Sequence, residues 1–365
     1  MEIERRDVLL SAAALAIGMA APACAAAPRK LGYAIVGLGY YGLKVIIPKF
    51  ADCEHSRLAA VVSGDPIKAR RVAAEHGLDP KSVYSYADFD RIRDNPDVDI
   101  VYVCLPNSMH AEYTIRAAKA GKHVLCEKPM AISVAECEAM IAACRRANRQ
   151  LMIGYRSHFE PHNLEAMRLA RTGAAGKIRY VRSEHGFVQG DPQAWRLKKA
   201  LSGGGSLMDM GIYSLQAARY MTGEEPIAVT ARESTDRSDP RFTEVEDIID
   251  WTLEFPSGAI ASCQSMYSAN QNHILLMGDK GRIELEPATA YHGQRLWIGN
   301  GRDKEITPPP GPGATQWAGQ LDHLSQCVMQ NREPIVGGEE GLRDIRIIEA
   351  VYRSVREQKR IALRS

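Results

Sequence analysis

The strongest constraint on this chain is a glycine pattern that follows a short apolar run near the N-terminus. Residues 31–36 are mostly apolar and β-prone, and Gly37, Gly39 and Gly42 then form G-x-G-x-x-G before a helix-like run over 43–51. In this motif the first glycine permits a tight turn, the second lets a pyrophosphate approach the backbone, and the third lets the helix pack on the strand. The helix N-terminus offers free N–H groups to phosphate oxygens. The pattern therefore predicts a dinucleotide-binding site.

Residues 1–27 have the features of an export signal. Arg5 and Arg6 precede an apolar run over 8–21, and the small-residue stretch 23–27 offers A-x-A cleavage sites. These features are typical of a secretory signal peptide of the twin-arginine type, a route that exports folded proteins. Cys24 leaves a lipoprotein site as the alternative. We expect this segment to be removed, leaving a periplasmic protein with no membrane attachment.

Composition excludes several classes of protein. The 365 residues are 45% hydrophobic and 25% charged, an ordinary globular composition with room for two domains. A formal net charge of +2 and the lack of a Lys/Arg block argue against nucleic-acid binding. The cysteines form no C-x-x-C pair, and no pair of histidines has ligand spacing with a third donor nearby. We expect buried thiols and no metal site.

Short apolar runs alternate with helix-like runs up to residue 154. Strands are expected at 58–62, 99–105, 123–126 and 151–153, and helices at 110–120 and 134–148. This alternation predicts a parallel sheet, so residues 28–154 are interpreted as an NADP-binding Rossmann domain. Ligands of such sheets bind at the carboxyl ends of the strands. Leu105, Pro106, Asn107 and His110 are therefore candidate cofactor contacts.

The end of the second expected strand bears on the choice of cofactor. NAD-specific folds usually place Asp or Glu there to hold the ribose 2′-hydroxyl. Here the strand ends in Ser63 and Gly64, and Lys68 follows on the next helix with other basic residues. This favours a 2′-phosphate and hence NADP. Asp65 lies two residues after the position of the acidic residue in NAD-specific folds, so NAD remains the alternative cofactor. The basic residues are also compatible with a solvated helix face.

A lysine follows the strand expected at 123–126, in the sequence Glu127-Lys128-Pro129. Proline forbids continuation of the strand, and a side chain at this carboxyl end points toward the ligand side of a parallel sheet. Lys128 is therefore a candidate active-site residue. A surface lysine in a turn is the alternative.

The pattern changes after residue 154. A helix is expected at 163–172, followed by strands at 178–188, 227–232, 248–255, 259–267, 274–277, 282–286 and 295–298. These predict an α+β domain over 155–340 with an antiparallel sheet of about six or seven strands. Residues 302–316 are expected to be a loop because they are rich in proline and glycine. The region 341–365 begins with a helix, 341–357, that should dock back on the body of the protein.

The stretch 203–213 combines a glycine loop with two chemically active side chains. Gly203 opens the loop, Ser206 is a candidate cap, and Asp209 and Tyr213 share one face of the helix that follows. A carboxylate can orient substrate hydroxyls and a phenol can exchange a proton. A phenol alone stays protonated at neutral pH and so cannot act as a base. A nearby ammonium such as Lys128 would favour its phenolate form, which can. A core tyrosine and an acidic residue at a helix N-terminus are the alternative.

These motifs occur together in one known family. Residues 37–42, Glu127-Lys128-Pro129 and the segment ending in Asp209-x-x-x-Tyr213 resemble the glucose–fructose oxidoreductase/inositol dehydrogenase/MocA family, over roughly residues 30–360. The last position of the third motif is usually histidine in the family, and tyrosine there is similar to glucose–fructose oxidoreductase itself. Further stretches share the likeness: 106–112, 152–156, 195–197, 223–226 and 320–324.

The resemblance implies a Rossmann dinucleotide-binding domain and a second domain with a large open antiparallel sheet. It implies that Lys128, Asp209 and Tyr213 are catalytic and that a sugar contacts Lys128, Tyr155, Arg156, Asp209 and Tyr213. The cofactor-binding residues, combined with those at the strand ends, are Gly37, Leu38, Gly39, Tyr40, Tyr41, Gly42, Ser63, Gly64, Lys68, Leu105, Pro106, Asn107, His110, Glu127, Lys128 and Arg156.

The implied activity is oxidation of an aldopyranose at C1 to the lactone, with reduction of a second sugar by tightly bound NADPH. The second sugar is an aldose, reduced to an alditol, or fructose. Glucose–fructose oxidoreductase has an arm that wraps a partner subunit over the cofactor, whereas only residues 28–30 separate the expected signal from the first strand here. The missing arm argues against a tetramer and against retention of the cofactor by such an arm. An exposed face of the antiparallel sheet can pack against a second copy, so we expect a homodimer. The alternatives are an NADP-dependent sugar dehydrogenase with exchangeable cofactor and a non-catalytic sensor, which would not need Lys128, Asp209 and Tyr213.

Overall fold

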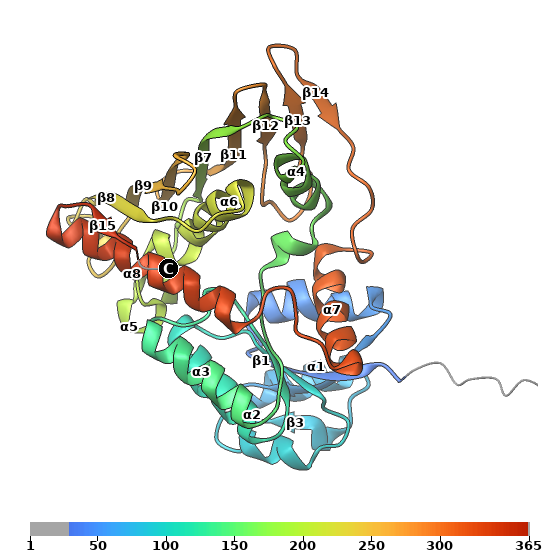
Figure 1. The fold of residues 1–365 in the computed structure, drawn as a ribbon. Helices are drawn as coiled ribbons and strands as arrows, with labels where there is room; N and C mark the ends of the chain where they lie inside the picture. The colour runs from blue at the N-terminus through green and yellow to red at the C-terminus, as the bar shows by residue number, and fades with distance from the viewer. Residues whose placement is uncertain (1–28, 364–365) are drawn as a thin grey trace, which may run out of the picture.

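The first sheet is built from the apolar runs between residues 31 and 153. The computed structural model describes residues 29–363, so the expected signal peptide lies outside the described residues. Six parallel strands lie in the order β3-β2-β1-β4-β5-β6 (Figure 1). Their bounds are β1 Leu31–Val36, β2 Ser56–Val62, β3 Val83–Tyr84, β4 Ile100–Val103, β5 His123–Cys126 and β6 Leu151–Ile153. This confirms the Rossmann domain, and the strand order reverses between β1 and β4, where such sheets bind ligands.

Helices connect these strands as the alternation predicts. They are α1 Pro66–Glu75, α2 His110–Lys119 and α3 Val134–Arg146. The helix expected at 43–51 is instead a π-helical segment, Tyr41–Ile46, followed by a 3-10 segment, Ile47–Asp52. Pro48 explains this break, since proline donates no backbone hydrogen bond and its ring clashes with the preceding turn.

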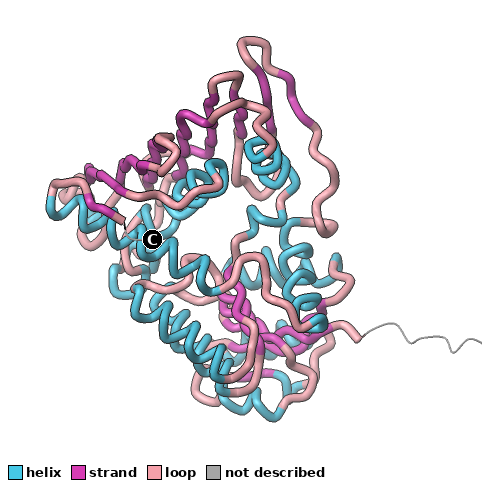
Figure 2. The backbone as a smooth tube through the Cα atoms, in the orientation of Figure 1, coloured by secondary structure: helices cyan, strands magenta, loops and turns pink. Residues whose placement is uncertain are grey.

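The second sheet has nine strands in the order β14-β13-β12-β11-β7-β10-β9-β8-β15, and Figure 2 shows the strands gathered in two separate regions. Their bounds are β7 Ile178–Gly186, β8 Ala228–Ser234, β9 Ile248–Glu254, β10 Ile260–Met266, β11 Gln271–Gly278, β12 Arg282–Leu285, β13 Leu296–Gly299, β14 Lys304–Ile306 and β15 Ile361–Ala362. The sheet is therefore mostly antiparallel, as expected, but larger than expected.

Two features of this sheet differ from the sequence-based prediction. Strand β14 lies inside the expected loop 302–316, and β15 follows the last helix and pairs with β8. Strand β10 pairs in parallel with β7, with Ile260 opposite Tyr180. The pairings of β15 with β8 and of β10 with β7 join segments that are distant in sequence, so the local alternation of apolar residues does not reveal them.

The remaining helices link the two domains. They are α4 Pro161–Arg171, α5 Lys199–Ser202, α6 Ile212–Thr222, α7 Gln316–Gln330 and α8 Gly338–Glu357. Helix α6 packs against β7 and β10, α4 packs against β12, and α8 packs against α3 and β8. Helix α7 lies against the Rossmann domain, where Leu321 accepts a hydrogen bond of 2.7 Å from the Tyr33 hydroxyl and Asp322 accepts one of 2.8 Å from the Ser56 hydroxyl.

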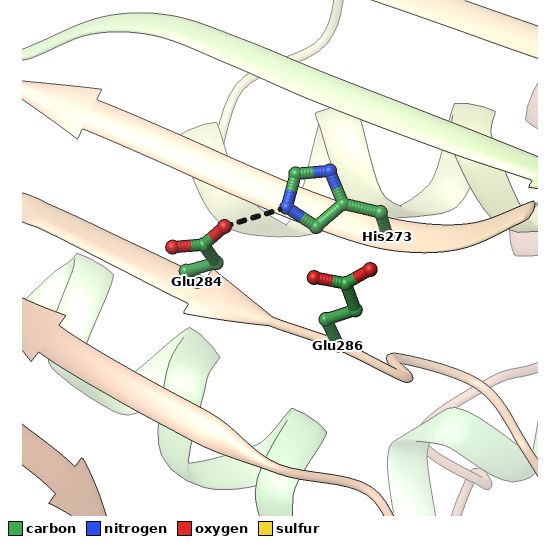
Figure 3. Close-up of side chains that lie close together, drawn as sticks. All are labelled: His273, Glu284 and Glu286. Atoms are coloured by element: carbon green, nitrogen blue, oxygen red, sulfur yellow. Dashed lines mark hydrogen bonds and ion pairs between the residues drawn. The ribbon is translucent and has the colours of Figure 1, made fainter.

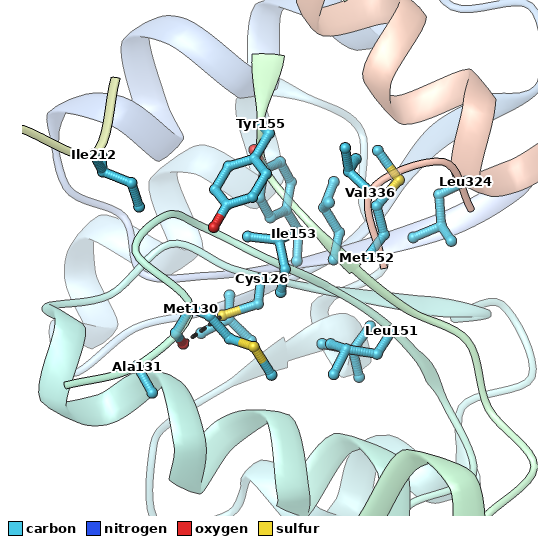
Figure 4. Packing of buried hydrophobic residues seen from close by; sticks show 14 of the residues in the cluster. Cys126, Met130, Ala131, Leu151, Met152, Ile153, Tyr155, Ile212, Leu324 and Val336 are labelled. Atoms are coloured by element: carbon cyan, nitrogen blue, oxygen red, sulfur yellow. Dashed lines mark hydrogen bonds between the residues drawn. The ribbon is translucent and has the colours of Figure 1, made fainter. Parts of the chain in front are cut away.

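One hydrophobic core runs from the Rossmann sheet into the second domain. Cys126 and Ile153 at the ends of β5 and β6 contribute to the same cluster as Ile212 of α6 and Leu324 of α7, all 1% exposed or less (Figure 4). This shared core fixes the carboxyl ends of the parallel strands relative to α6. Within residues 29–363, no helix has the length and apolar character needed to cross a membrane.

Candidate active site

The glycine loop has the geometry that a dinucleotide needs. Gly37 has a φ of +101°, and a Cβ atom there would lie 2.3 Å from the carbonyl oxygen of Cys104. A Cβ atom on Gly42 would lie 2.4 Å from the carbonyl oxygen of Gly37, so the helical segment packs directly on the loop. At Gly39 such an atom would meet no neighbour within 4 Å in the described part of the chain. This open space at the start of a helical segment fits a pyrophosphate.

The other residues of the loop differ in exposure. Leu38 is buried in the core, whereas the Tyr40 side chain is exposed. Tyr41 is half-buried and lies near Glu127 and Tyr213. Burial, with a contribution from Glu127, raises the pKa of Tyr41 well above its ordinary value. Tyr41 therefore connects the loop with the residues expected to be catalytic.

The end of β2 is the place where a ribose diol and a 2′-phosphate would be distinguished. The Asp65 carboxylate caps α1, accepting hydrogen bonds from the backbone N–H groups of Ile67 at 3.0 Å and Lys68 at 2.9 Å. The Ser63 hydroxyl accepts a hydrogen bond from the Asp65 backbone at 3.1 Å, and Gly64 leaves the backbone exposed. The helix engages only Oδ1 of Asp65, so the cap alone does not remove this carboxylate as a partner for a ribose diol, and Ser63 and Lys68 remain the residues expected to hold a 2′-phosphate.

Asn107 and His110 hold strand ends in place. The Asn107 side chain donates a hydrogen bond of 2.8 Å to the carbonyl oxygen of Ser202. The two ring nitrogens of His110 lie 2.8 Å from the carbonyl oxygen of Pro129 and 2.9 Å from that of Leu105. Both side chains are buried, and burial lowers the pKa of His110. They fix the loops on both sides of the site, while Pro106 is half-buried between them.

Glu127 is buried behind Lys128. It accepts a hydrogen bond from the Tyr102 hydroxyl, to which Gln320 of α7 donates at 3.0 Å. Burial raises the pKa of Glu127. A Cβ atom on Gly154 would lie 2.8 Å from the Glu127 carboxylate, so a larger residue there would displace this carboxylate. Glu127 therefore ties the end of β5 to α7.

The Asp209 carboxylate is surrounded by two cationic side chains and a tyrosine hydroxyl. Lys128 donates from Nζ to the Asp209 backbone carbonyl oxygen at 2.7 Å and to Oδ1 at 3.1 Å. Arg196 donates from Nε to Oδ2 at 2.8 Å, and the Tyr267 hydroxyl donates to the same oxygen at 3.1 Å. Burial alone would raise the pKa of Asp209, but Arg196 and Lys128 outweigh it and hold the pKa well below its usual range. Protein donors therefore occupy both carboxylate oxygens.

Two cations lie over the ring of Tyr213. Lys128 Nζ is 4.8 Å and Arg156 Cζ is 5.1 Å from the ring centroid. Burial would lower the pKa of Lys128, but Tyr213 and Asp209 raise it overall, so the side chain remains an ammonium. When the Tyr213 hydroxyl gives up a proton, the resulting negative charge lies near both cations. This is an arrangement for proton transfer at a substrate oxygen.

His185 lies on the other side of Tyr213. The two rings are 5.7 Å apart with a tilt of 32°. Its Nδ1 is 2.9 Å from the Ser214 hydroxyl, which in turn donates to the Gln264 carbonyl oxygen at 2.9 Å. Nδ1 must therefore carry the proton, and burial, with a contribution from Arg156, lowers the pKa of His185 to about 3. The imidazole is neutral beside the phenol.

Arg156 and Tyr155 are adjacent in sequence but lie in different surroundings. Arg156 is 5% exposed and donates to Gln316 at 2.9 Å, and its guanidinium lies over Tyr213. Tyr155 is 2% exposed and lies in the hydrophobic core near Ile153 (Figure 4). The structure does not bring Tyr155 to the expected sugar site, because the turn after β6 directs its ring inward.

The loop before Asp209 is held by a buried carboxylate. Glu246 accepts hydrogen bonds from the backbone N–H groups of Gly205 at 2.8 Å and Leu207 at 3.0 Å, and from the Tyr352 hydroxyl at 2.9 Å. A Cβ atom on Gly205 would lie 2.1 Å from the Glu246 carbonyl oxygen, so this glycine serves protein packing. The cap expected from Ser206 is not formed, since its hydroxyl pairs with that of Ser265 at 3.0 Å.

His273, Glu284 and Glu286 form the one group with metal-compatible spacing in residues 29–363, with ligand atoms within 4.8 Å of one another (Figure 3). His273 Nε2 lies 2.9 Å from one Glu284 oxygen, and Arg282 lies 3.4 Å from the other. Glu284 is thus paired within the protein, and we assign no metal to the group.

Family models match both halves of the chain. Residues 31–155 match "Oxidoreductase family, NAD-binding Rossmann fold", and residues 163–284 match "GFO/IDH/MocA C-terminal domain". D-xylose 1-dehydrogenase [NADP(+)] from Haloarcula marismortui is 30% identical over 342 residues, covering 91% of this chain and 92% of the relative. The chain belongs to the GFO/IDH/MocA family. This confirms the family resemblance seen in the motifs.

Further proteins are similar to this chain in sequence or in structure. The crystal structure of aldose-aldose oxidoreductase from Caulobacter crescentus, complexed with glycerol, is 60% identical, has a TM-score of 0.90, and covers 92% of this chain and 100% of that chain. Inositol 2-dehydrogenase from Rhizobium meliloti is 25% identical over 351 residues, covering 91% of this chain and 98% of the relative. Levoglucosan dehydrogenase, in complex with NADH and levoglucosan, is 23% identical with a TM-score of 0.79 over 92% of this chain and 100% of its own, and shows the fold alone.

Sequence reasoning did not identify several side chains of the site. Arg196 could have been identified from the sequence, because it lies in the stretch 195–197 that resembles the GFO/IDH/MocA family. Tyr267 follows an ordinary strand, His185 lies inside one, and Glu246 precedes one, with no motif around them. Their roles depend on contacts between segments far apart in the chain.

Proposed function

We propose that the protein is an NADP-dependent sugar oxidoreductase that oxidises an aldopyranose at C1 to the lactone and reduces a second sugar. The observation that carries the proposal is the contact of Lys128 with both Asp209 and the Tyr213 ring. An ammonium beside a phenol is suited to moving a proton to or from a sugar oxygen. The 60% identity to the aldose-aldose oxidoreductase of Caulobacter crescentus supports a second sugar, and specifically an aldose, as acceptor.

The residues present fit NADP. The open space beside Gly39 accommodates the pyrophosphate, and Ser63 and Lys68 would hold the 2′-phosphate. Similarity to an NADP(+)-dependent D-xylose dehydrogenase supports this choice. When bound, the nicotinamide takes up the hydride from C1 of the first sugar and supplies it to the second.

Tyr213 performs the proton transfers in this proposal. As C1 loses its hydride, ionised Tyr213 removes the proton of the C1 hydroxyl, which leaves the carbonyl of the lactone. In the second half-reaction the Tyr213 hydroxyl donates this proton to the carbonyl oxygen of an open-chain sugar, giving an alditol. Lys128 and Arg156 stabilise the negative charge on the phenol oxygen before the first half-reaction and after the second. Asp209 holds Lys128 in position.

We further propose that the enzyme works in the periplasm with NADP tightly bound. Arg5 and Arg6, followed by an apolar run and A-x-A sites, support export of a folded chain. A compartment without a supply of NADP requires the cofactor to arrive with the protein and to be recycled in place. The second sugar provides the recycling step.

A homodimer through the outer face of the second sheet completes the proposal. Helices α4 and α6 lie on one face of this sheet (Figure 1). On the other face Tyr180 lies opposite Ile260 in β10 and Met277 in β11, which are 44% and 38% exposed. A row of partly exposed apolar side chains on an open sheet is a surface that a second copy can cover. Light scattering after gel filtration should give the mass of a dimer, and a monomer would refute this part.

The test of the main proposal uses mature protein purified without added nucleotide. Incubation with glucose alone should yield lactone and alditol in equal amounts, and denaturation should release NADP(H) close to one per chain. The second candidate is an NADP-dependent dehydrogenase with exchangeable cofactor, which the similarity to D-xylose 1-dehydrogenase [NADP(+)] supports. A protein that arrives empty and turns over only with NADP⁺ supplied from solution would establish that candidate instead.

A further inference from the structure

A short segment between β12 and β13 lies close to the Rossmann domain. We call residues 288–291 the bridging segment. Asn272 of β11 accepts hydrogen bonds at its Oδ1 from the backbone N–H groups of Ala288 at 3.0 Å and Thr289 at 2.7 Å. The start of the bridging segment is therefore fixed to the second sheet.

Two residues close to the Rossmann domain hold the rest of the bridging segment: Arg156, which follows β6, and Gln316, which begins α7. Arg156 donates to the carbonyl oxygen of Thr289 and, at 3.4 Å, to that of Ala290. Gln316, at the start of α7, donates to the Tyr291 carbonyl oxygen at 3.2 Å and accepts from Arg156 at 2.9 Å. The backbone of the bridging segment thus has fixed partners on both sides of the site.

This anchoring places the Tyr291 ring over Arg156. Arg156 Cζ is 5.1 Å from the Tyr291 centroid and also 5.1 Å from the Tyr213 centroid. The edge of the Tyr291 ring meets Trp317 of α7 at 5.2 Å and 86°. Lys49, in the helical segment that follows the glycine loop, lies 5.7 Å from the Trp317 ring. Tyr291 is therefore linked through Arg156 to the Tyr213 ring and through Trp317 to the helical segment that follows the glycine loop.

The surroundings of Tyr291 include residues of the expected cofactor site. Burial raises the pKa of its hydroxyl, and Tyr213, Glu127 and Tyr40 are the neighbours that add to this shift. Tyr40 belongs to the glycine loop and Glu127 precedes Lys128. Yet 38% of Tyr291 remains exposed, so the residue is not enclosed by the protein around it. An aromatic ring held by a cation and a second aromatic ring is a rigid cover.

We propose that Tyr291 covers the nicotinamide end of the dinucleotide site and slows the release of NADP. This inference rests on the proposed function, which places the cofactor along the glycine loop with its reactive end near Lys128 and Tyr213. Because the bridging segment is anchored by Asn272 at one end and by Arg156 and Gln316 at the other, the nucleotide leaves only when the Tyr291 ring moves. The ring, and not its hydroxyl, is the retaining group.

The test measures cofactor release from holoenzyme. Wild type, Tyr291→Ala, Tyr291→Phe and the control Met329→Ala are loaded with NADPH, and the loss of its bound fluorescence is followed after addition of excess NADP⁺. Met329 is similarly exposed, at 41%, but lies near the far end of α7. Tyr291→Ala should release NADPH at least roughly tenfold faster than wild type, whereas Tyr291→Phe and Met329→Ala should match wild type.

The outcomes separate this inference from the proposed function. If wild type and Tyr291→Ala hold NADPH equally well, Tyr291 is not the retaining residue and the proposed function stands. If wild type itself exchanges cofactor rapidly, tight binding and this inference fail together. Release that is equally fast in Tyr291→Phe and Tyr291→Ala would move the retaining role from the ring to the hydroxyl and overturn the inference as stated. Thermal unfolding of each variant checks that Tyr291→Ala is folded.

Discussion

Lys128 Nζ lies 2.7 Å from the backbone carbonyl oxygen of Asp209 and 3.1 Å from its carboxylate. The backbone carbonyl and the carboxylate of Asp209 therefore both hold the Lys128 ammonium. The ammonium also lies 4.8 Å from the centroid of the Tyr213 ring. Lys128 follows β5 of the Rossmann domain, and Asp209 lies just before α6 of the second domain. The pair thus joins the two domains at the point where the proton transfers are proposed.

The first prediction concerns the Tyr213 hydroxyl. Because this group is proposed to act in the transition state, Tyr213→Phe should lower kcat by ~10²–10⁴ while the NADP content stays near that of wild type. Tyr220→Phe is the matched control, since Tyr220 lies on the same helix and its hydroxyl bonds Glu340 at 3.0 Å. Steady-state kinetics with an aldose measure both. A loss below about tenfold in Tyr213→Phe would remove this residue from acid–base chemistry.

The sequence was most informative where local pattern alone decides structure. The strands Leu31–Val36, His123–Cys126 and Leu151–Ile153 have the bounds that the apolar runs predicted. These strands are buried on both sides, so continuous apolar runs specify them. The parallel pairing of β10 with β7 could not be predicted, because the partner of a strand depends on segments far away in the chain.

The same division applies to the site. Lys128, Asp209 and Tyr213 stood out because each lies in a short motif, and the structure brings them together. Arg196 and Tyr267 complete the surroundings of Asp209, but only the folded chain shows which carboxylate they contact. Tyr155 illustrates the converse, since a residue next to Arg156 in sequence lies in the core in space.

The second prediction concerns cofactor choice. Lys68→Ala should weaken binding of NADP(H) by about 1–3 kcal/mol, the value of a charge-assisted hydrogen bond to the 2′-phosphate, and should barely change binding of NAD(H). Arg71→Ala is the control, because Arg71 lies on the same helix and contacts Glu75 at 3.6 Å. Fluorescence titration of cofactor-free protein measures the four affinities. Equal weakening of both nucleotides would assign Lys68 to the fold and direct attention to Asp65.

The third prediction concerns Glu246, the buried carboxylate that holds the loop before Asp209. Glu246→Gln replaces one acceptor oxygen by an NH₂ group that cannot accept from Gly205 or Leu207. One buried N–H then loses its partner, so the free energy of unfolding should fall by about 1–3 kcal/mol. Urea unfolding measures this, with exposed Glu244→Gln as a control that should change it by less than ~0.5 kcal/mol. An unchanged free energy in Glu246→Gln would show that the loop does not depend on this carboxylate.

The last prediction concerns buried neutral histidines. Burial lowers the pKa of His158 to about 4 and that of His185 to about 3, below the ordinary ~6.5. In the unfolded chain these groups bind protons below pH ~6.5, whereas in the folded chain they stay neutral until the pH is much lower. Their contribution to stability is therefore complete above pH ~6.5 and is lost as the pH falls toward their folded values.

The loss of this histidine contribution to the free energy of unfolding should be measurable at mildly acidic pH. Between pH 7 and pH 5 each histidine should lower the free energy of unfolding by on the order of 2 kcal/mol. His158→Asn removes one titrating group, so the difference between urea unfolding at these two pH values should shrink by that amount, whereas His76→Asn, on the exposed end of α1, should leave it as in wild type. A His158→Asn protein with the full wild-type pH dependence would show that His158 is charged or exposed in the folded state.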